Sequence, residues 1–341
     1  MEVKLNHFKI VICALLLSIF SHVPILCIAS EQVTDGPIAR NQLKSTVQNL
    51  LYQEKFDVLD GMAQEFRKTK ARFPEGLWKL QFFYEGLVPK DKSPEGWKNY
   101  LAIVGKWFEK SPDSITARVA AGSAWEEYGA YVRGKGYADT VTEEMWRVLG
   151  ESFQKAYGLL ENKPSDPTED CPERYATLLN IARVQGWPRP QFEALFHEAV
   201  TFEPTYYPFY LLKARYLLPR WHGEEGEWQQ FAKDAISLTP ESEGKSVYMR
   251  IVGSFLIPVD ITSFSDPGIS WSLLKQGYLD VERNFPGSRW NLNMFCKYAC
   301  KAGDKETAKE LFKRIGDKPY IEAWGTRTEF EQWRKWAGDE T

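Results

Sequence analysis

The stretch LNMFCKYACKAGDKETAKELFKRI, at residues 292–315, decides the fold class. In each half of it, apolar or small side chains recur three or four positions apart: Leu292, Phe295, Cys296, Ala299, Ala308, Phe312 and Ile315. This spacing places the side chains of each half on one face of a helix. Gly303 and Asp304 interrupt the pattern, and such a pair is typical of a turn followed by a helix cap. The stretch therefore predicts a hairpin of two amphipathic helices.

The same helical period runs through most of the chain. Apolar stripes occupy residues 43–51, 56–66, 101–108, 117–131, 145–160, 175–184, 192–202, 210–218, 228–238 and 270–281. Prolines at 74, 112, 164, 204, 240, 286 and 319 close successive stripes at intervals of 33 to 52 residues. A degenerate period of this length, with two helices per unit, is typical of helical-repeat arrays. We expect an all-α fold, an α-solenoid of stacked helical hairpins; the alternative is an irregular all-helical domain.

The hairpin at 292–315 resembles the tetratricopeptide repeat in its small residues where the two helices touch. Cys296 takes one such small position, and Pro319 lies close to where that repeat ends. Three further stretches resemble uncharacterised bacterial exported proteins with tetratricopeptide-like helices, classed as a domain of unknown function. They are LDGMAQEF at 59–66, SITARVAAGSAWEEYGAYVRGKGYADTV at 114–141 and EPTYYPFYLLKARYLLPRW at 203–221, with GEW at 226–228. The resemblance implies export and helical repeats, and it carries no known activity.

The N-terminus has the pattern of a secretory signal peptide. Lys4 and Lys9 precede the uncharged run IVICALLLSIF at 10–20, and CIAS at 27–30 supplies small residues for cleavage after Ala29. We expect a signal peptide at 1–29, a short linker at 30–40 and a helical-repeat domain at 41–341, in a periplasmic or secreted protein. The alternative is an uncleaved anchor, although the run is shorter than the roughly 20 apolar residues a membrane span needs. After cleavage we expect no stable membrane span.

Composition and motifs exclude several functional classes. The 341 residues carry a formal charge of −3, which gives no electrostatic case for nucleic-acid binding. FHEAV at 196–200 begins like a zinc-protease helix, but Thr201 stands where the second histidine is needed. Phosphate-loop, dinucleotide and G-x-S-x-G patterns do not occur. The sequence therefore predicts no catalytic residue, metal site or cofactor.

The cysteines give no disulfide framework. Three remain after signal cleavage, at Cys171, Cys296 and Cys300. The last two are four residues apart on one helix, where Cβ atoms lie about 5–6 Å apart, and a disulfide needs about 3.5–4.5 Å. We expect buried free thiols.

Two segments between helical stripes are candidates for binding. RGKGYADT at 133–140 contains Arg133, Tyr137 and Asp139, and PRWHGEEGEW at 219–228 contains Arg220, Trp221 and Trp228. Each combines a cation, an aromatic ring and carboxylates on a loop, where binding residues are common. We hypothesise that the two loops flank one groove for a protein or peptide segment. The alternative is that both are tight structural corners whose arginines bond to backbone carbonyls or carboxylates.

Two functions follow as expectations. The first is an exported, non-enzymatic binding or scaffold protein built from helical repeats. The second is an all-helical envelope hydrolase acting on glycans or peptides, because carboxylates are plentiful and such enzymes need only a pair of them. Two facing acids in a deep aromatic pocket would favour the enzyme, and a long groove lined by Tyr, Trp and Arg would favour binding.

Overall fold

The computed structural model describes residues 35–136, 138–256 and 268–338. All of them belong to one compact unit, Val33–Thr341. The predicted signal peptide at 1–29 lies outside the described residues, as does Tyr137 of the first candidate loop.

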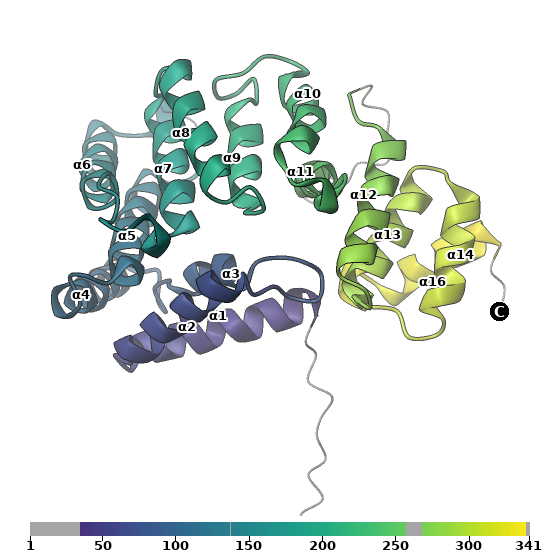
Figure 1. The fold of residues 1–341 in the computed structure, drawn as a ribbon, viewed down its shortest axis with the longest axis horizontal. Coiled ribbons are helices and arrows are strands. Elements are labelled where there is room, and N and C mark those ends of the chain that lie inside the picture. Colours follow the sequence, from purple (N-terminus) through teal and green to yellow (C-terminus); the bar gives the residue numbers. More distant parts are fainter. Residues whose placement is uncertain (1–34, 137, 257–267, 339–341) are drawn as a thin grey trace, which may run out of the picture. The chain divides into compact units, whose positions relative to one another are not determined.

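The described part of the chain is all-helical, which confirms the expected fold class (Figure 1). Its only β pairing is an isolated bridge between Arg72 and Trp78. The α-helices are α1 (Gly36–Tyr52), α2 (Phe56–Thr69), α3 (Lys79–Gly86), α4 (Pro94–Lys110), α5 (Ile115–Arg133), α6 (Glu143–Leu160), α7 (Pro172–Gln185), α8 (Arg189–Phe202), α9 (Pro208–Tyr216), α10 (Glu227–Asp234), α11 (Ser246–Leu256), α12 (Trp271–Asn284), α13 (Arg289–Lys301), α14 (Lys305–Ile315), α15 (Ile321–Trp324) and α16 (Arg327–Ala337). Short 3₁₀ turns are η1 (Ala138–Thr140), η2 (Pro167–Glu169), η3 (Ala235–Leu238) and η4 (Glu241–Glu243).

The stretch at 292–315 forms the predicted hairpin, α13 and α14. The Asp304 carboxylate caps α14 by accepting a hydrogen bond from the Thr307 amide at 3.1 Å. Cys296 packs at the contact between the two helices, with its Sγ 3.7 Å from the Ala308 carbonyl oxygen. Cys171, Cys296 and Cys300 are all buried free thiols. The small residues therefore allow the close approach that the sequence predicted.

The expected linker at 30–40 is helical from Gly36 onward. Asp35 explains this difference, because its carboxylate accepts hydrogen bonds from Ser288 Oγ at 3.0 Å and from the Trp290 amide at 2.8 Å. Gly36 has φ +66°, and a Cβ there would lie 2.7 Å from the Tyr320 hydroxyl oxygen. The start of α1 is thus anchored against the C-terminal third of the chain, and the domain begins earlier than residue 41.

Polar side chains cap helix N-termini. Ser93 caps α4, with its Oγ accepting from the Gly96 amide at 3.1 Å. The cap of α6 is Thr142, whose hydroxyl accepts from the Met145 amide.

Alternate helices contact one another along the middle of the chain. α5 packs against α7, α7 against α9, and α9 against α11, while α3 also contacts α7. Aromatic side chains are among the largest in the core, and Trp78, Trp107 and Trp324 are almost fully buried. α5 and α7 therefore each lie between neighbouring helices. Of the helices in the described ranges, none combines the length and the apolar character that crossing a bilayer requires.

Candidate functional site

Three arginines gather where α7 ends and the loop after α9 begins: Arg183, Arg215 and Arg220. We call them the arginine cluster. The loop folds over the end of α7, because His222 Nε2 lies 2.6 Å from the Arg183 carbonyl oxygen. The Arg183 guanidinium lies over the Trp221 ring, 4.1 Å from its centroid. Trp221 is 39% exposed, so part of this pair remains open to solvent.

Charge repulsion within the arginine cluster is not balanced by ion pairs. Burial, together with the positive charges of Arg215 and Arg220, lowers the pKa of Arg183 to about 10, against the opposing effect of Glu126. Burial and Arg220 also lower the pKa of Arg215. Arg183 donates from Nη2 to the neutral Asn180 Oδ1 at 2.7 Å. Among the described residues, no carboxylate lies within ion-pair distance of these guanidinium groups, although Glu126 and Glu85 act on Arg183 and Arg215 at longer range.

Three carboxylates lie beside the arginine cluster, and we call them the carboxylate cluster: Glu126, Glu127 and Glu173. The first two are on α5 and the third is in the first turn of α7. Burial raises the pKa of Glu126 to about 7 and that of Glu127 to about 8, and Glu126 adds to the rise at Glu127. Burial likewise raises the pKa of Glu173 to about 8. These acids therefore exchange protons near neutral pH, as general acids and bases do.

Asn180 and Tyr206 hold the carboxylate cluster in place. Asn180 Nδ2 donates to Glu126 Oε1 at 2.6 Å, while its Oδ1 accepts from Arg183, so one amide joins the two clusters. The Tyr206 hydroxyl donates to Glu173. Each of the three carboxylates keeps part of its surface exposed, although burial dominates its pKa.

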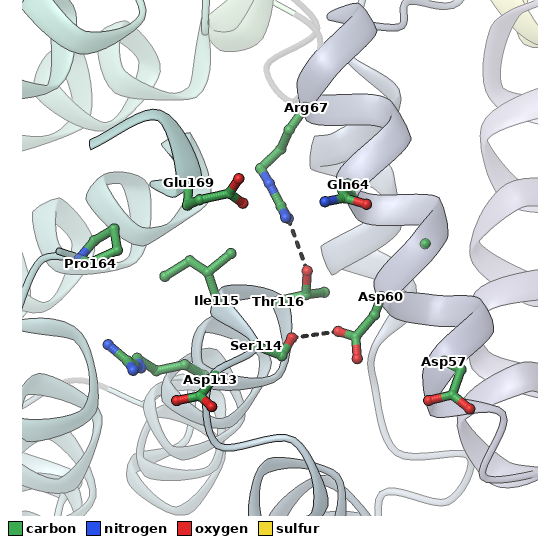
Figure 2. Close-up of a pocket in the computed structure, with 12 residues that line it drawn as sticks. Asp57, Asp60, Gln64, Arg67, Asp113, Ser114, Ile115, Thr116, Pro164 and Glu169 are labelled. Atoms are coloured by element: carbon green, nitrogen blue, oxygen red, sulfur yellow. Dashed lines mark hydrogen bonds between the residues drawn. The ribbon is translucent and has the colours of Figure 1, made fainter. Parts of the chain in front are cut away.

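A polar pocket of about 500 Å³ lies where α2 faces the start of α5 (Figure 2). Its polar groups bond across the two helices: Ser114 Oγ donates to Asp60 Oδ1 at 2.5 Å, and Arg67 Nη1 donates to Thr116 Oγ1 at 2.9 Å. Glu169 projects into it from the η2 side. These bonds tie α2 to α5, which gives the pocket a structural role. No group of residues in the described ranges has the composition of a metal site.

The first predicted loop has the contacts of a structural corner. Arg133 Nη1 donates to the carbonyl oxygens of Gly134 at 3.1 Å and Gly136 at 2.7 Å. Its guanidinium also lies 5.6 Å from the centroid of the Trp146 ring on α6. Asp139 lies in η1 and is exposed. Arg133 therefore makes the backbone bonds that the alternative interpretation of this loop expected.

The second predicted loop divides into an exposed part and a core part. Arg220 and Trp221 belong to the surface beside α7, as described above. Trp228 is instead buried at 8% exposure, with its ring centroid 4.4 Å from that of Phe255. Trp228 thus packs in the core and leaves little surface for a ligand. Arg133 contacts α6 while Trp221 contacts α7, so the described contacts give the two loops different neighbours.

Sequence reasoning missed Arg183, Arg215 and the carboxylate cluster. One signal for them was present. Glu126 and Glu127 interrupt the small and apolar run AAGSAW at 120–125, where two adjacent carboxylates are unexpected on a helix packed on most sides.

None of the models of known protein families matches the chain, and no curated protein matches it.

Proposed function

We propose that this protein is an exported, non-enzymatic helical-repeat protein that binds an acidic peptide segment of a partner. In this proposal the helices form a tetratricopeptide-like α-solenoid, residues 1–29 are a cleaved signal peptide, and the protein works in the periplasm or outside the cell. The resemblance to exported proteins with helical repeats supports the compartment. The α13–α14 hairpin and the packing of α5, α7, α9 and α11 in succession support the solenoid.

The arginine cluster is the observation that carries this proposal. Like charges repel, so three guanidinium groups held together without carboxylate partners raise the free energy of the unliganded protein. An anionic ligand relieves that repulsion, and Arg pairs with carboxylates in bidentate geometry. Trp221 adds an exposed aromatic surface of the kind found at peptide-binding sites.

The carboxylate cluster makes the expected binding dependent on pH. Below about pH 7, the raised pKa values keep these glutamates largely protonated. Above about pH 8 they ionise and repel an acidic ligand. The exposed glutamates of such a ligand stay charged throughout this range, so the change in binding comes from the protein. We therefore expect tighter binding of acidic peptides at about pH 6 than at about pH 9.

Fluorescence anisotropy with labelled hexaglutamate tests the proposal. We expect the purified protein to bind hexaglutamate at least about tenfold more tightly than labelled hexaserine, and labelled hexalysine not measurably. Arg215→Gln and Arg220→Gln should each weaken hexaglutamate binding by roughly three- to tenfold.

Arg147→Gln is the matched control, because it removes the same charge from an exposed pair with Glu144 on α6. It should leave the affinity within about a factor of two. Equal affinity for hexaglutamate and hexaserine, or equal weakening by all three arginine substitutions, would contradict the proposal.

A hydrolase of envelope glycans or peptides is the second candidate, and the carboxylate cluster favours it. One protonated glutamate could give its proton to the leaving group while an ionised one takes a proton from the attacking water. Two assays detect these activities. A peptidoglycan suspension loses turbidity if its glycan is hydrolysed, and casein releases peptides if the protein is a peptidase. Activity abolished by Glu127→Gln or Glu173→Gln, with the folded state retained, would establish the enzyme; the absence of both activities favours the binding protein.

A further inference from the structure

A second pocket, of about 240 Å³, lies between α1, α3, the start of α9, α11, α12 and α13. Its volume equals that of about eight water molecules in the liquid. Apolar and aromatic side chains form most of the wall, among them Tyr207, Tyr278, Trp290 and Met294. Arg40 and Arg250 supply its positive charge. A small number of polar groups in an apolar wall is the usual composition of small-molecule sites.

The two arginines are held by contacts that leave hydrogen-bonding capacity unused. Arg40 Nη1 pairs with Glu75 Oε1 at 2.7 Å, and its guanidinium lies 5.5 Å from the centroid of the Trp290 ring. Arg250 Nη2 donates to the Glu75 backbone oxygen, and the guanidinium lies 5.0 Å from the centroid of the Tyr207 ring. Arg250 Nε is buried and makes no hydrogen bond. A buried donor without a partner costs free energy that a ligand acceptor can recover.

The charge of the pocket is positive overall. Glu75 is fully buried, and it is the carboxylate that pairs with Arg40. Burial raises the pKa of Glu75, and the neighbouring Asp35 contributes to the rise. Arg40 and Arg250 line the pocket, whereas no carboxylate is among its lining residues.

We infer that this pocket binds a small aromatic carboxylate, whose ring packs against the Trp290 side and whose carboxylate accepts from Arg250. The volume fits one aromatic ring system with a short acidic side chain, and the positive charge selects the anion over its neutral and cationic analogues. This site is separate from the arginine cluster: Arg250 is on α11 and Arg40 on α1, whereas Arg183 is on α7. It adds a small-molecule ligand to the proposed peptide binding.

Calorimetric titration with three matched indoles tests the inference. Indole-3-acetate, indole-3-acetamide and tryptamine share one ring and differ in charge. We expect indole-3-acetate to bind at least about tenfold more tightly than either analogue. A tripeptide that ends in tryptophan, titrated in parallel, distinguishes a free acid from a peptide C-terminus as the source of the carboxylate. Whichever of the two binds more tightly, the inference requires that indole-3-acetate binds.

Gly253→Leu closes the pocket without removing a charge. Gly253 lines the pocket on α11, and a Cβ there meets no atom within 4 Å, so the added side chain extends into the open space. Gly150→Leu, on the exposed side of α6, is the matched control, since its Cβ also meets nothing within 4 Å. We expect Gly253→Leu to abolish the binding of indole-3-acetate and Gly150→Leu to preserve it. Arg250→Gln should weaken it about tenfold.

Three outcomes would overturn the inference: no heat of binding with indole-3-acetate up to millimolar concentration, equal affinity for all three indoles, or full binding by a folded Gly253→Leu variant. The anisotropy assay with hexaglutamate is independent of this pocket. A Gly253→Leu protein that still binds hexaglutamate therefore shows that the fold and the arginine cluster are intact.

Discussion

Replacing Glu127 by glutamine should make the protein more stable at alkaline pH and leave it nearly unchanged at acid pH. In the folded state, burial and the neighbouring glutamates raise the pKa of Glu127 from 4.5 to about 8. The unfolded chain releases this proton near pH 4.5, whereas the folded protein holds it. The free energy of unfolding therefore falls as the pH rises from about 4.5 through about 8. Glutamine has no proton to lose, so the variant avoids this loss.

The magnitude follows from the pKa difference. At about 1.4 kcal/mol per pKa unit, the difference between about 8 and 4.5 corresponds to about 5 kcal/mol. Repulsion from Glu126 and Glu173 supplies part of this value. We therefore expect the variant to exceed the native protein in free energy of unfolding by about 2–5 kcal/mol at pH 9. At pH 5 the two should differ by less than about 1 kcal/mol.

Urea unfolding followed by far-ultraviolet circular dichroism, at pH 5, 7 and 9, measures the effect. Glu95→Gln is the matched control, because Glu95 is in the first turn of α4 with 82% of its side chain exposed. The difference in free energy of unfolding between this control variant and the native protein should stay constant from pH 5 to pH 9. If Glu127→Gln is no more stable relative to the native protein at pH 9 than at pH 5, the placement of Glu127 in a desolvated carboxylate cluster is wrong.

Three other predictions follow from buried contacts and from the N-terminus. Asp170→Ala should lower the free energy of unfolding by about 3–5 kcal/mol in urea titration, because it leaves the guanidinium of Arg174, 1% exposed, without its bidentate partner. Gly122→Ala should destabilise the protein by about 1–3 kcal/mol, because its Cβ would lie 2.6 Å from a leucine side chain. Gly150→Ala, whose Cβ would meet nothing within 4 Å, should stabilise it by about 0.5–1 kcal/mol. Equal effects of the two substitutions in thermal unfolding would contradict the packing around Gly122. Intact-mass measurement of the exported protein should give a chain that begins at Ser30, and a full-length chain in the membrane fraction would refute the signal peptide.

The helices were predictable because their signals are local. An apolar side chain every three or four residues specifies a helix face, and Ser93 or Asp304 caps a helix through an amide three residues away. The start of α1 was not predictable in the same way. Asp35 and Gly36 are fixed by contacts with residues more than 250 positions away, such as Ser288 and Tyr320.

The candidate site was predictable only in part, for the same reason. Arg220 and Trp221 attract attention as a cation and an aromatic ring in a loop. Arg183 is on a helix in an apolar stripe, and its proximity to Arg215 and Arg220 depends on how the loop after α9 folds over α7. Trp228 is a tryptophan of the same predicted segment as Trp221, yet it is buried in the core. Sequence therefore identifies residue types, while the packing of α7 against α9 decides which of them share a surface.

Hydrogen exchange with and without hexaglutamate tests the central claim most directly, because it locates the ligand on the chain. The account predicts that saturating hexaglutamate at about pH 6 slows exchange in peptides covering the end of α7 and residues 215–223, and leaves α14 and α16 unchanged. It also predicts that this protection disappears in Arg215→Gln. Protection confined to other helices, or unchanged protection in the variant, would contradict the assignment of the arginine cluster as the peptide-binding surface.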